Sequence, residues 1–499
     1  MSFIRGLISY NIYPNLNHDF SKFNGNNSNY PITQFNHLNK NGVYVGLAYY
    51  NRKKTPNCII YKNIKYNYIF DGVIDNCDEL SKAIKQELGY LPIEKDDYAS
   101  IAAWSYILWG GFSPSKLFGK FSYAIYSEAV FEDGSYSPKL FLARDRAGTK
   151  PLYYTSTNNG KILFSSSVSA ILTQNEIKPT LGREGLWQAL FLGGNTAPGR
   201  TLFEGIYEIE PGACAYIDCR RDGLCSVIQK RYYALRHPSQ EDFKIHIDKF
   251  HIENDYVEDI VIYRKADVTD LCLQCVDICE APVFLNQIFA LSNKNDFSVL
   301  FSRVGSEIYN INGEGHIRSF FPWISDPYAH IEYFKKEISR PSDGFNWLFD
   351  IYTAAKEAYS FDEDKDVSEK RIKMCMQRFI NIPCRLKYVE KLADHYSVSV
   401  SYPFASNDLF EHTYYTLGKT DEPRFDVKYF KKIKKDSGFD DGIKRELYKI
   451  ISNPENRINY LIDREKVKAQ LEISGVTESI ELMYLFHLWL EKFDVEIKV

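Results

Sequence analysis

Residues 151–167 contain a strand-turn-strand pattern, which limits the first half of the chain to folds rich in antiparallel strands. The runs PLYYTST and KILFSSS are rich in aromatic and β-branched side chains, and Asn159-Gly160 stands between them. An Asn-Gly pair suits a type I′ turn, because both of its central positions need a positive φ. Asp222-Gly223 separates the runs CAYIDCR and CSVIQ in the same way. We therefore expect two hairpins, and a further strand over residues 140–146.

Helices are interspersed with these strands. Leu80, Ile84 and Leu88 recur at helical spacing between Asp75-Asn76, which can cap a helix start, and Gly89, which can end a helix. A second helix is expected over Tyr98–Trp109. The first half should therefore be a mixed α/β layer dominated by antiparallel strands.

The pattern changes to helical in the second half, where helices are expected over 345–360, 367–397 and 479–493. A chain of 499 residues exceeds the ~250–300 residues at which one core stops growing. We expect two domains, residues 1–232 and 245–499. The Asn-rich residues 11–42 suggest an irregular insertion.

The charge balance disfavours a nucleic-acid partner, because 61 basic residues face 65 acidic ones and the formal net charge is -4. No apolar run approaches the ~20 residues that a membrane span needs. The start MSFIRGLISYNIYPN lacks the basic region and cleavage site of a signal peptide. We expect a cytoplasmic protein that does not bind membranes and whose scattered cysteines stay reduced.

The most specific motif lies within residues 117–154, which read LFGKFSYAIY and then LFLARDRAGTKPLYY. These residues resemble the glutamine amidotransferase half of asparagine synthetases, and the resemblance continues to about residue 217. In the second half VLFSRVGSEIY, at 299–309, is similar to the family's second acidic motif. Tyr402-Pro403-Phe404 and Lys434–Phe439 resemble two later motifs, so the resemblance covers nearly the whole chain.

The resemblance implies an α/β (α+β) fold class. Residues 1–232 would form an αββα class II glutamine-amidotransferase-like sandwich of the Ntn type. Residues 245–499 would form a truncated, helix-rich α/β synthetase domain similar to ATP pyrophosphatases. ATP and Mg²⁺ are the family's cofactors, and whether this chain binds them is an open question, because its motif residues differ.

The family's glutaminase site is altered both at the nucleophile and at the oxyanion turn. Its nucleophile is a cysteine that becomes the first residue when Met1 is removed. The free α-amine of that cysteine acts as the base. Here that position holds Ser2, followed by Phe3 in place of a glycine. The family's Asn-Gly-Glu oxyanion turn appears as Asp71-Gly72-Val73, and an aspartate there would repel the developing negative charge. We interpret Ser2 and Asp71 as degenerate catalytic positions, with Gly72 retained for the turn; a Ser2-dependent amidase is the alternative.

The synthetase motifs are altered further. The string S-G-G-x-D-S, which in the family holds pyrophosphate at a helix N-terminus, does not occur. The stretch from Tyr232 to Glu280 is too short to contain it, which suggests a deletion near 235–245. Arg303 and Val304 stand where a glycine and an acid are expected, although Mg²⁺ needs oxygen ligands. The degenerate nucleotide-binding positions are Ser302, Gly305, Glu307 and Lys435.

Other chemically suggestive clusters are better explained as structure. Cys272, Cys275 and Cys279 would share one helix face and fit a buried core. His246 and His251 fit the polar face of a strand, so no metal site is predicted. Charged residues in the run 144–150 are expected to pair across a turn and hold the sandwich together.

These observations favour an asparagine synthetase-like pseudoenzyme that acts as a binding or regulatory partner. An active paralogue or a peptide substrate would be its partner, and a homodimer is also compatible with the sequence. The alternative is an ATP-dependent amide ligase without glutaminase activity, like the lactam synthetases and lasso-peptide cyclases of the same family. The pyrophosphate loop, which those enzymes keep, separates the two hypotheses.

Overall fold

The structure, a computed structural model, describes most of the chain. The described residues are 3–9, 33–38, 44–50, 58–94, 96–130, 136–157, 160–219, 225–236, 299–301, 304–305, 308–309, 321–323, 328–361, 364–396, 399–418 and 437–499. They belong to two compact units. The first comprises Met1–Lys178, Pro198–Arg200 and Gly205–Ala234, and the second comprises Pro179–Ala197, Thr201–Glu204 and Leu235–Val499. The sequence pattern gave no sign that residues 179–197 belong with the second unit, and the expected domains 1–232 and 245–499 stay a prediction.

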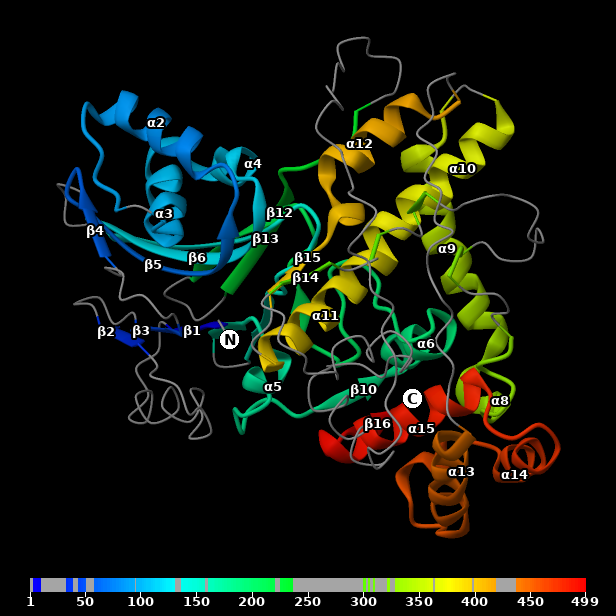
Figure 1. The fold of residues 1–499 in the computed structure, drawn as a ribbon. Coiled ribbons are helices and arrows are strands. Elements are labelled where there is room, and N and C mark those ends of the chain that lie inside the picture. The colour runs from blue at the N-terminus through cyan, green and yellow to red at the C-terminus, as the bar shows by residue number, and fades with distance from the viewer. Residues whose placement is uncertain are drawn as a thin grey trace. The chain divides into compact units, whose positions relative to one another are not determined.

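The first unit contains two six-stranded sheets (Figure 1). One has the order β11-β8-β9-β1-β3-β2. Its strands are β1 (Phe3–Ser9), β2 (Thr33–Leu38), β3 (Tyr44–Tyr50), β8 (Tyr153–Ser156), β9 (Lys161–Ser165) and β11 (Tyr207–Glu208). The antiparallel pairing of β8 with β9 confirms the hairpin predicted around Asn159-Gly160. The expectation that residues 11–42 are irregular is wrong for β2, because pairing with β3 makes a strand of this Asn-rich segment.

The other sheet has the order β13-β12-β7-β6-β5-β4. Its strands are β4 (Cys58–Tyr61), β5 (Ile64–Ile74), β6 (Gly119–Val130), β7 (Tyr136–Arg144), β12 (Ala213–Cys219) and β13 (Cys225–Arg231). The second predicted hairpin is confirmed as the antiparallel pair of β12 and β13. A buried core with residues from both sheets lies between them, and it includes Ile4, Leu47, Ile69, Leu142 and Phe164.

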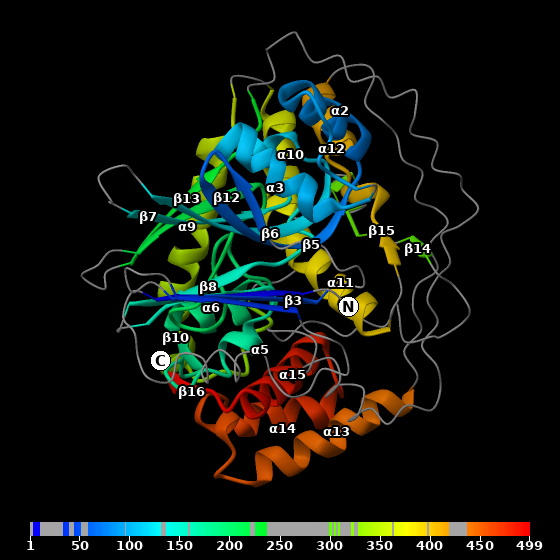
Figure 2. The same ribbon diagram turned by 90° about the vertical axis from the view of Figure 1, so that its left-hand side faces the viewer.

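Helices complete the layers of this unit. They are α2 (Cys77–Leu88), α3 (Tyr98–Trp109), η1 (Gly110–Phe112), α4 (Ser113–Lys116) and α5 (Val168–Ile171). Both α2 and α3 were predicted, and they pack on the outer face of the sheet that contains β5. The short α5 lies beyond the other sheet (Figures 1 and 2). The expected αββα layering and mixed α/β class are confirmed.

The second unit is rich in helices, as expected. Its described helices are α6 (Arg183–Phe191), α8 (Lys336–Ser339), α9 (Pro341–Tyr359), α10 (Lys365–Met376), the π-helical η5 (Gln377–Asn381), α11 (Ile382–Tyr396), η6 (Pro403–Ala405), α12 (Asn407–Thr416), α13 (Ser437–Ser452), η7 (Arg457–Tyr460), α14 (Arg464–Ile473) and α15 (Glu478–Lys492). Two short parallel strand pairs accompany them: β10 (Thr180–Gly182) with β16 (Glu496–Lys498), and β14 (Val299–Phe301) with β15 (Ser399–Ser401). Across the described ranges, no helix is both long and apolar enough to cross a membrane.

Candidate functional site

The turn expected at Asp71-Gly72 is part of strand β5, and the Asp71 side chain is buried. Asp71 is 3% exposed and pairs with Ser122 of β6, while Gly72 pairs with Phe121. Gly72 has a φ of 131°, and a Cβ added to it would lie 2.0 Å from the carbonyl oxygen of Lys120. Only glycine fits this backbone. The close approach of β5 to β6 at this position therefore depends on Gly72, and Asp71 supplies the side chain that faces the interior.

Asp71 is paired with a cation that the sequence did not connect to it. Its Oδ1 lies 3.6 Å from Nζ of Lys150, and both side chains are almost fully buried. A carboxylate accepts hydrogen bonds and donates none, so Asp71 cannot serve as the donor that an oxyanion needs. The ammonium group compensates the buried negative charge. This position thus holds an internal ion pair in place of a neutral amide donor.

The turn after β7 holds Lys150 in place. Asp145 is fully buried, and its carboxylate accepts hydrogen bonds from the backbone N–H groups of Phe121, Ala147, Thr149 and Lys150 at 3.0–3.3 Å. Burial raises the pKa of Asp145, while these hydrogen bonds oppose that shift. The carboxylate fixes the backbone of Lys150 and so directs its side chain toward Asp71.

Arg144 makes a second buried ion pair beside this turn. Its Nη1 lies 2.9 Å from Oε1 of Glu208 and donates to the carbonyl of Ile209, while Nη2 donates to the carbonyl of Gly148. Arg144 and Lys150 of the charged run 144–150 are therefore paired, but with Glu208 and Asp71, which lie outside that run. Arg146 behaves differently, because its guanidinium stacks on the Phe118 ring at 4.5 Å.

The expected nucleophile position, Ser2, lies outside the described residues. The chain is described from Phe3, where β1 begins, and the next residue is held firmly. The backbone N–H of Ile4 donates to Oγ of Ser166, and its carbonyl accepts from the N–H of Ser166. This pairing anchors the start of β1 beside the end of β9.

The second unit brings two of the synthetase-like motifs together. VLFSRVGSEIY begins with β14, Tyr402-Pro403-Phe404 follows β15, and these two strands pair in parallel. Their carboxyl ends therefore meet, which is where open α/β sheets bind ligands. Gly305 has a φ of 107°, and its added Cβ would lie 2.5 Å from the carbonyl carbon of Phe404. The hydroxyl of Tyr309 donates to the carbonyl oxygen of Phe404 at 3.0 Å.

The other candidate residues of this unit are only partly described. Val304, at the position where the family has an acid, is 5% exposed. Ser302, Arg303, Glu307 and Lys435 lie outside the described residues. The same is true of the three cysteines at 272–279 and the histidines at 246 and 251. Within the described ranges, no group of three or more His, Cys, Asp or Glu side chains could hold a metal ion.

Sequence reasoning missed Arg378, which lies in the π-helical segment η5. Its side chain is 1% exposed, donates through Nη2 to Oδ1 of Asn407 and lies 5.3 Å from the Phe410 ring centre. Its Nε and Nη1 have no hydrogen-bond partner in the part of the chain that the structure describes. Burial raises the pKa of Tyr309, and the positive charge of Arg378 opposes that shift. The sequence signal for this site was the single arginine in the segment KMCMQRFIN. Its position in a π-helical segment adds to its interest, because such segments often occur at functional sites.

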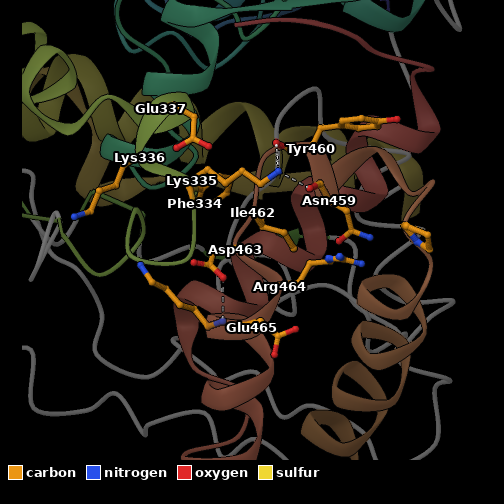
Figure 3. Close-up of a pocket in the computed structure, with 12 residues that line it drawn as sticks. Phe334, Lys335, Lys336, Glu337, Asn459, Tyr460, Ile462, Asp463, Arg464 and Glu465 are labelled. Atoms are coloured by element: carbon orange, nitrogen blue, oxygen red, sulfur yellow. Dashed lines mark hydrogen bonds between the residues drawn. The ribbon is translucent and has the colours of Figure 1, made fainter.

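A groove of about 650 Å³ lies between the start of α8 and the start of α14 (Figure 3). Lys335 on its wall donates to the carbonyls of Asn459 and Tyr460, and Asp463 caps α14 through the N–H of Lys466. Both basic and acidic side chains line the wall, so the groove has no strong preference for either sign of charge. None of its residues belongs to a motif identified in the sequence.

Comparison with known proteins agrees with the motifs of the first unit. Residues 47–233 match the family model of the glutamine amidotransferase domain. The chain carries a glutamine amidotransferase region. Asparagine synthetase [glutamine-hydrolyzing] 3 of Bacillus subtilis (strain 168) is 32% identical over 171 residues, which are 34% of this chain and 26% of that protein. Asparagine synthetase [glutamine-hydrolyzing] 1 of the same strain is 29% identical over 153 residues, 31% of this chain and 22% of that protein.

The amidotransferase region is thus of the asparagine synthetase type, and the match spans about a quarter of the length of these relatives. Among solved structures, the glutamine phosphoribosylpyrophosphate amidotransferase of B. subtilis, complexed with ADP and GMP, covers 60% of each chain at 10% identity. The TM-score of that comparison is 0.33.

Proposed function

We propose that this asparagine synthetase-like protein is catalytically degenerate and acts as a binding or regulatory partner. The observation that carries the proposal is the buried ion pair of Asp71 with Lys150 at the position of the family's oxyanion turn. Glutamine hydrolysis passes through a tetrahedral oxyanion, which preorganised donors must stabilise. Asp71 offers a negative charge there, and Lys150 is already engaged with it.

The sequence at the nucleophile supports the same proposal. Ser2 replaces the cysteine, and Phe3 puts a large side chain where the family has glycine. A serine hydroxyl needs an efficient base and a well-formed oxyanion site to react, because it is a weak nucleophile at its free pKa. The combination of Ser2 with Asp71 removes both the reactive thiol and the donor.

Features of the second unit support the proposal that this protein does not adenylate a carboxylate. Activation of a carboxylate by ATP needs acidic ligands for Mg²⁺ and backbone N–H groups around the phosphates. Val304 is buried and apolar at one acidic position, and no S-G-G-x-D-S string occurs in the chain. The partner of such a protein would be an active paralogue, a peptide or a second copy of this chain, and the proposed location is the cytoplasm.

One observation favours the alternative of an amide ligase without glutaminase activity. Arg378 is buried next to Tyr309, which follows β14, and its Nε and Nη1 are not used by the described residues. A buried guanidinium suits an oxyanion such as a carboxylate or phosphate. A ligase could use this group to bind an acidic substrate even though the amidotransferase site is altered.

Exchange of radiolabelled pyrophosphate into ATP tests the proposal against this alternative. With aspartate and Mg²⁺ present, we expect no exchange above a protein-free control. Exchange that disappears in Glu307→Ala would overturn the pseudoenzyme proposal and favour the ligase. An intact asparagine synthetase run beside the protein shows that the assay detects adenylation.

A further inference from the structure

A buried arginine contacts each end of helix α12. Both arginines come from the continuous segment of α10 and η5, and Arg371 and Arg378 are each 1% exposed. Nη1 of Arg371 donates to the carbonyl of Tyr414, in the last turn of α12. Nη2 of Arg378 donates to Oδ1 of Asn407, the first residue of α12. Figures 1 and 2 show α12 next to α10, so one segment places two equally buried cations at the two ends of one helix.

The two ends of α12 differ in how well they suit a cation. The carboxyl end of a helix carries a partial negative charge, which Arg371 compensates, whereas the amino end carries a partial positive charge. Arg378 adds its own positive charge to the amino end. The first N–H groups of α12 have no acceptor within the helix, and Ser406 at the N-cap forms no side-chain hydrogen bond with them. Positive charge therefore accumulates at the start of α12, which favours an anion there.

Arg378 keeps donors for such an anion. Its Nε and Nη1 are buried and have no hydrogen-bond partner among the described residues, and its guanidinium lies 5.3 Å from the ring centre of Phe410, in the first turn of α12. Asp408, the acidic residue of this turn, is exposed and forms no ion pair with Arg378 within the described ranges. Asn407 is only partly buried, which gives a ligand access to the turn from solvent.

The backbone that leads into α12 is held in place by residues that follow β14. The hydroxyl of Tyr309 donates to the carbonyl oxygen of Phe404 at 3.0 Å. Gly305 approaches the same backbone so closely that an added Cβ would lie 2.6 Å from the backbone nitrogen of Ala405. Phe404 and Ala405 belong to η6, which ends directly before the N-cap residue Ser406. A helix start that is fixed in this way presents its N–H groups with little cost of ordering on binding.

We propose that Arg378 and the first turn of α12 bind a phosphate group, either free or carried by a small metabolite. Nε and Nη1 of Arg378 donate to the phosphate oxygens, and the first N–H groups of α12 donate from the backbone. A phosphate offers more acceptor oxygens than a carboxylate, which suits a site with donors from both a side chain and a helix start. This inference goes beyond the proposed function and does not depend on it, because a regulatory protein and a ligase could both use the site.

The test is isothermal titration calorimetry of the full chain with inorganic phosphate at constant ionic strength. We expect saturable binding that Arg378→Met weakens at least about tenfold, because the charge-assisted hydrogen bonds of the guanidinium are lost. Asn407→Asp should abolish binding and raise the melting temperature, because the new carboxylate compensates Arg378 and the helix start in place of phosphate. A higher melting temperature shows that this second variant loses the site and not the fold.

The control comes from the other end of α12. Arg371→Lys keeps a cation at the carbonyl of Tyr414 and should leave the affinity for phosphate unchanged. Glycerol 3-phosphate distinguishes the sources of the group: binding at least as tight as that of inorganic phosphate indicates a phosphate ester, and weaker binding indicates free phosphate. Absence of phosphate binding, equal binding of acetate, or equal weakening by Arg371→Lys and Arg378→Met would overturn the proposal.

Discussion

The two units treat buried charge differently. In the first unit Arg144 pairs with Glu208 and Lys150 with Asp71, while Asp145 is surrounded by backbone donors. In the second unit Arg378 is as deeply buried as Arg144, yet both its Nε and its Nη1 have no described partner, whereas Arg144 lacks one only at Nε. Paired charges stabilise a folded unit, whereas an unsatisfied buried group needs an explanation, of which a bound ligand is one. Under the proposed function the first unit serves as a scaffold, and the surroundings of Arg378 are where the second unit would bind an anion.

Removing the central acceptor of the first unit should have the largest effect. Asp145→Ala leaves four backbone N–H groups without an acceptor, and each unsatisfied buried group costs about 1–3 kcal/mol. We expect a loss of about 4 kcal/mol or more in the free energy of unfolding, measured with urea. Asp343→Ala is the control, because the Asp343 carboxylate is half exposed and lies 4.0 Å from the guanidinium of Arg340. Similar stabilities of the two variants would contradict the scaffold role.

The ion pair of Asp71 with Lys150 should come next. Lys150→Met leaves the Asp71 carboxylate buried without its cation, which should destabilise the protein by about 3 kcal/mol. The double variant Asp71→Leu/Lys150→Met removes both charges and should recover most of that loss. Urea unfolding of the wild type and both variants provides the comparison. Additive losses would show that the two groups do not compensate each other.

The second unit contains another buried ionisable group, His487 of α15, whose Nδ1 has no described hydrogen-bond partner. Unlike Arg378, His487 can lose its charge. Burial lowers the pKa of His487 from 6.5 to about 4. Between these values the unfolded chain binds a proton that the folded protein does not, so stability should fall as the pH is lowered from about 6.5 to about 4. The shift corresponds to about 3 kcal/mol. Urea unfolding of His487→Leu should show a smaller fall over that range, and an unchanged pH dependence would contradict the assignment.

Replacing Arg378 should change the stability of the protein least, and the direction of that change is informative. Arg378→Met removes an incompletely paired buried charge and should leave stability unchanged or raise it by about 1 kcal/mol. Inorganic pyrophosphate should raise the melting temperature of the wild type and not that of Arg378→Met. Strong destabilisation together with an equal response of both proteins to pyrophosphate would show that Arg378 is structural.

Local signals predicted the first unit well. The Asn159-Gly160 and Asp222-Gly223 hairpins and the helices α2 and α3 depend on turn residues and spacing that lie close together in the sequence. Strand β2 was missed, because its partner β3 and not its own composition makes it a strand. The cause of this failure is tertiary pairing, which a local pattern does not contain.

The candidate sites were predicted less completely. Asp71 and Gly72 were found through their resemblance to a motif, but Lys150 was assigned to the scaffold, because its approach to Asp71 is created by the fold. Arg378 was missed for the same reason, since its burial depends on helices that meet only in the folded unit. Sequence identifies the type of residue at such sites, and the structure supplies its charge environment.

Glutamine-dependent ammonia release tests the central claim most directly, because the claim is that the amidotransferase region has lost its chemistry. The full chain, with removal of Met1 verified by mass spectrometry, is incubated with glutamine, and ammonia is measured beside an active glutamine-hydrolysing asparagine synthetase. The ion pair at Asp71 and the serine at position 2 predict no release above the rate of Ser2→Ala. Release by the wild type that disappears in Ser2→Ala would contradict the account and establish Ser2 as an active nucleophile.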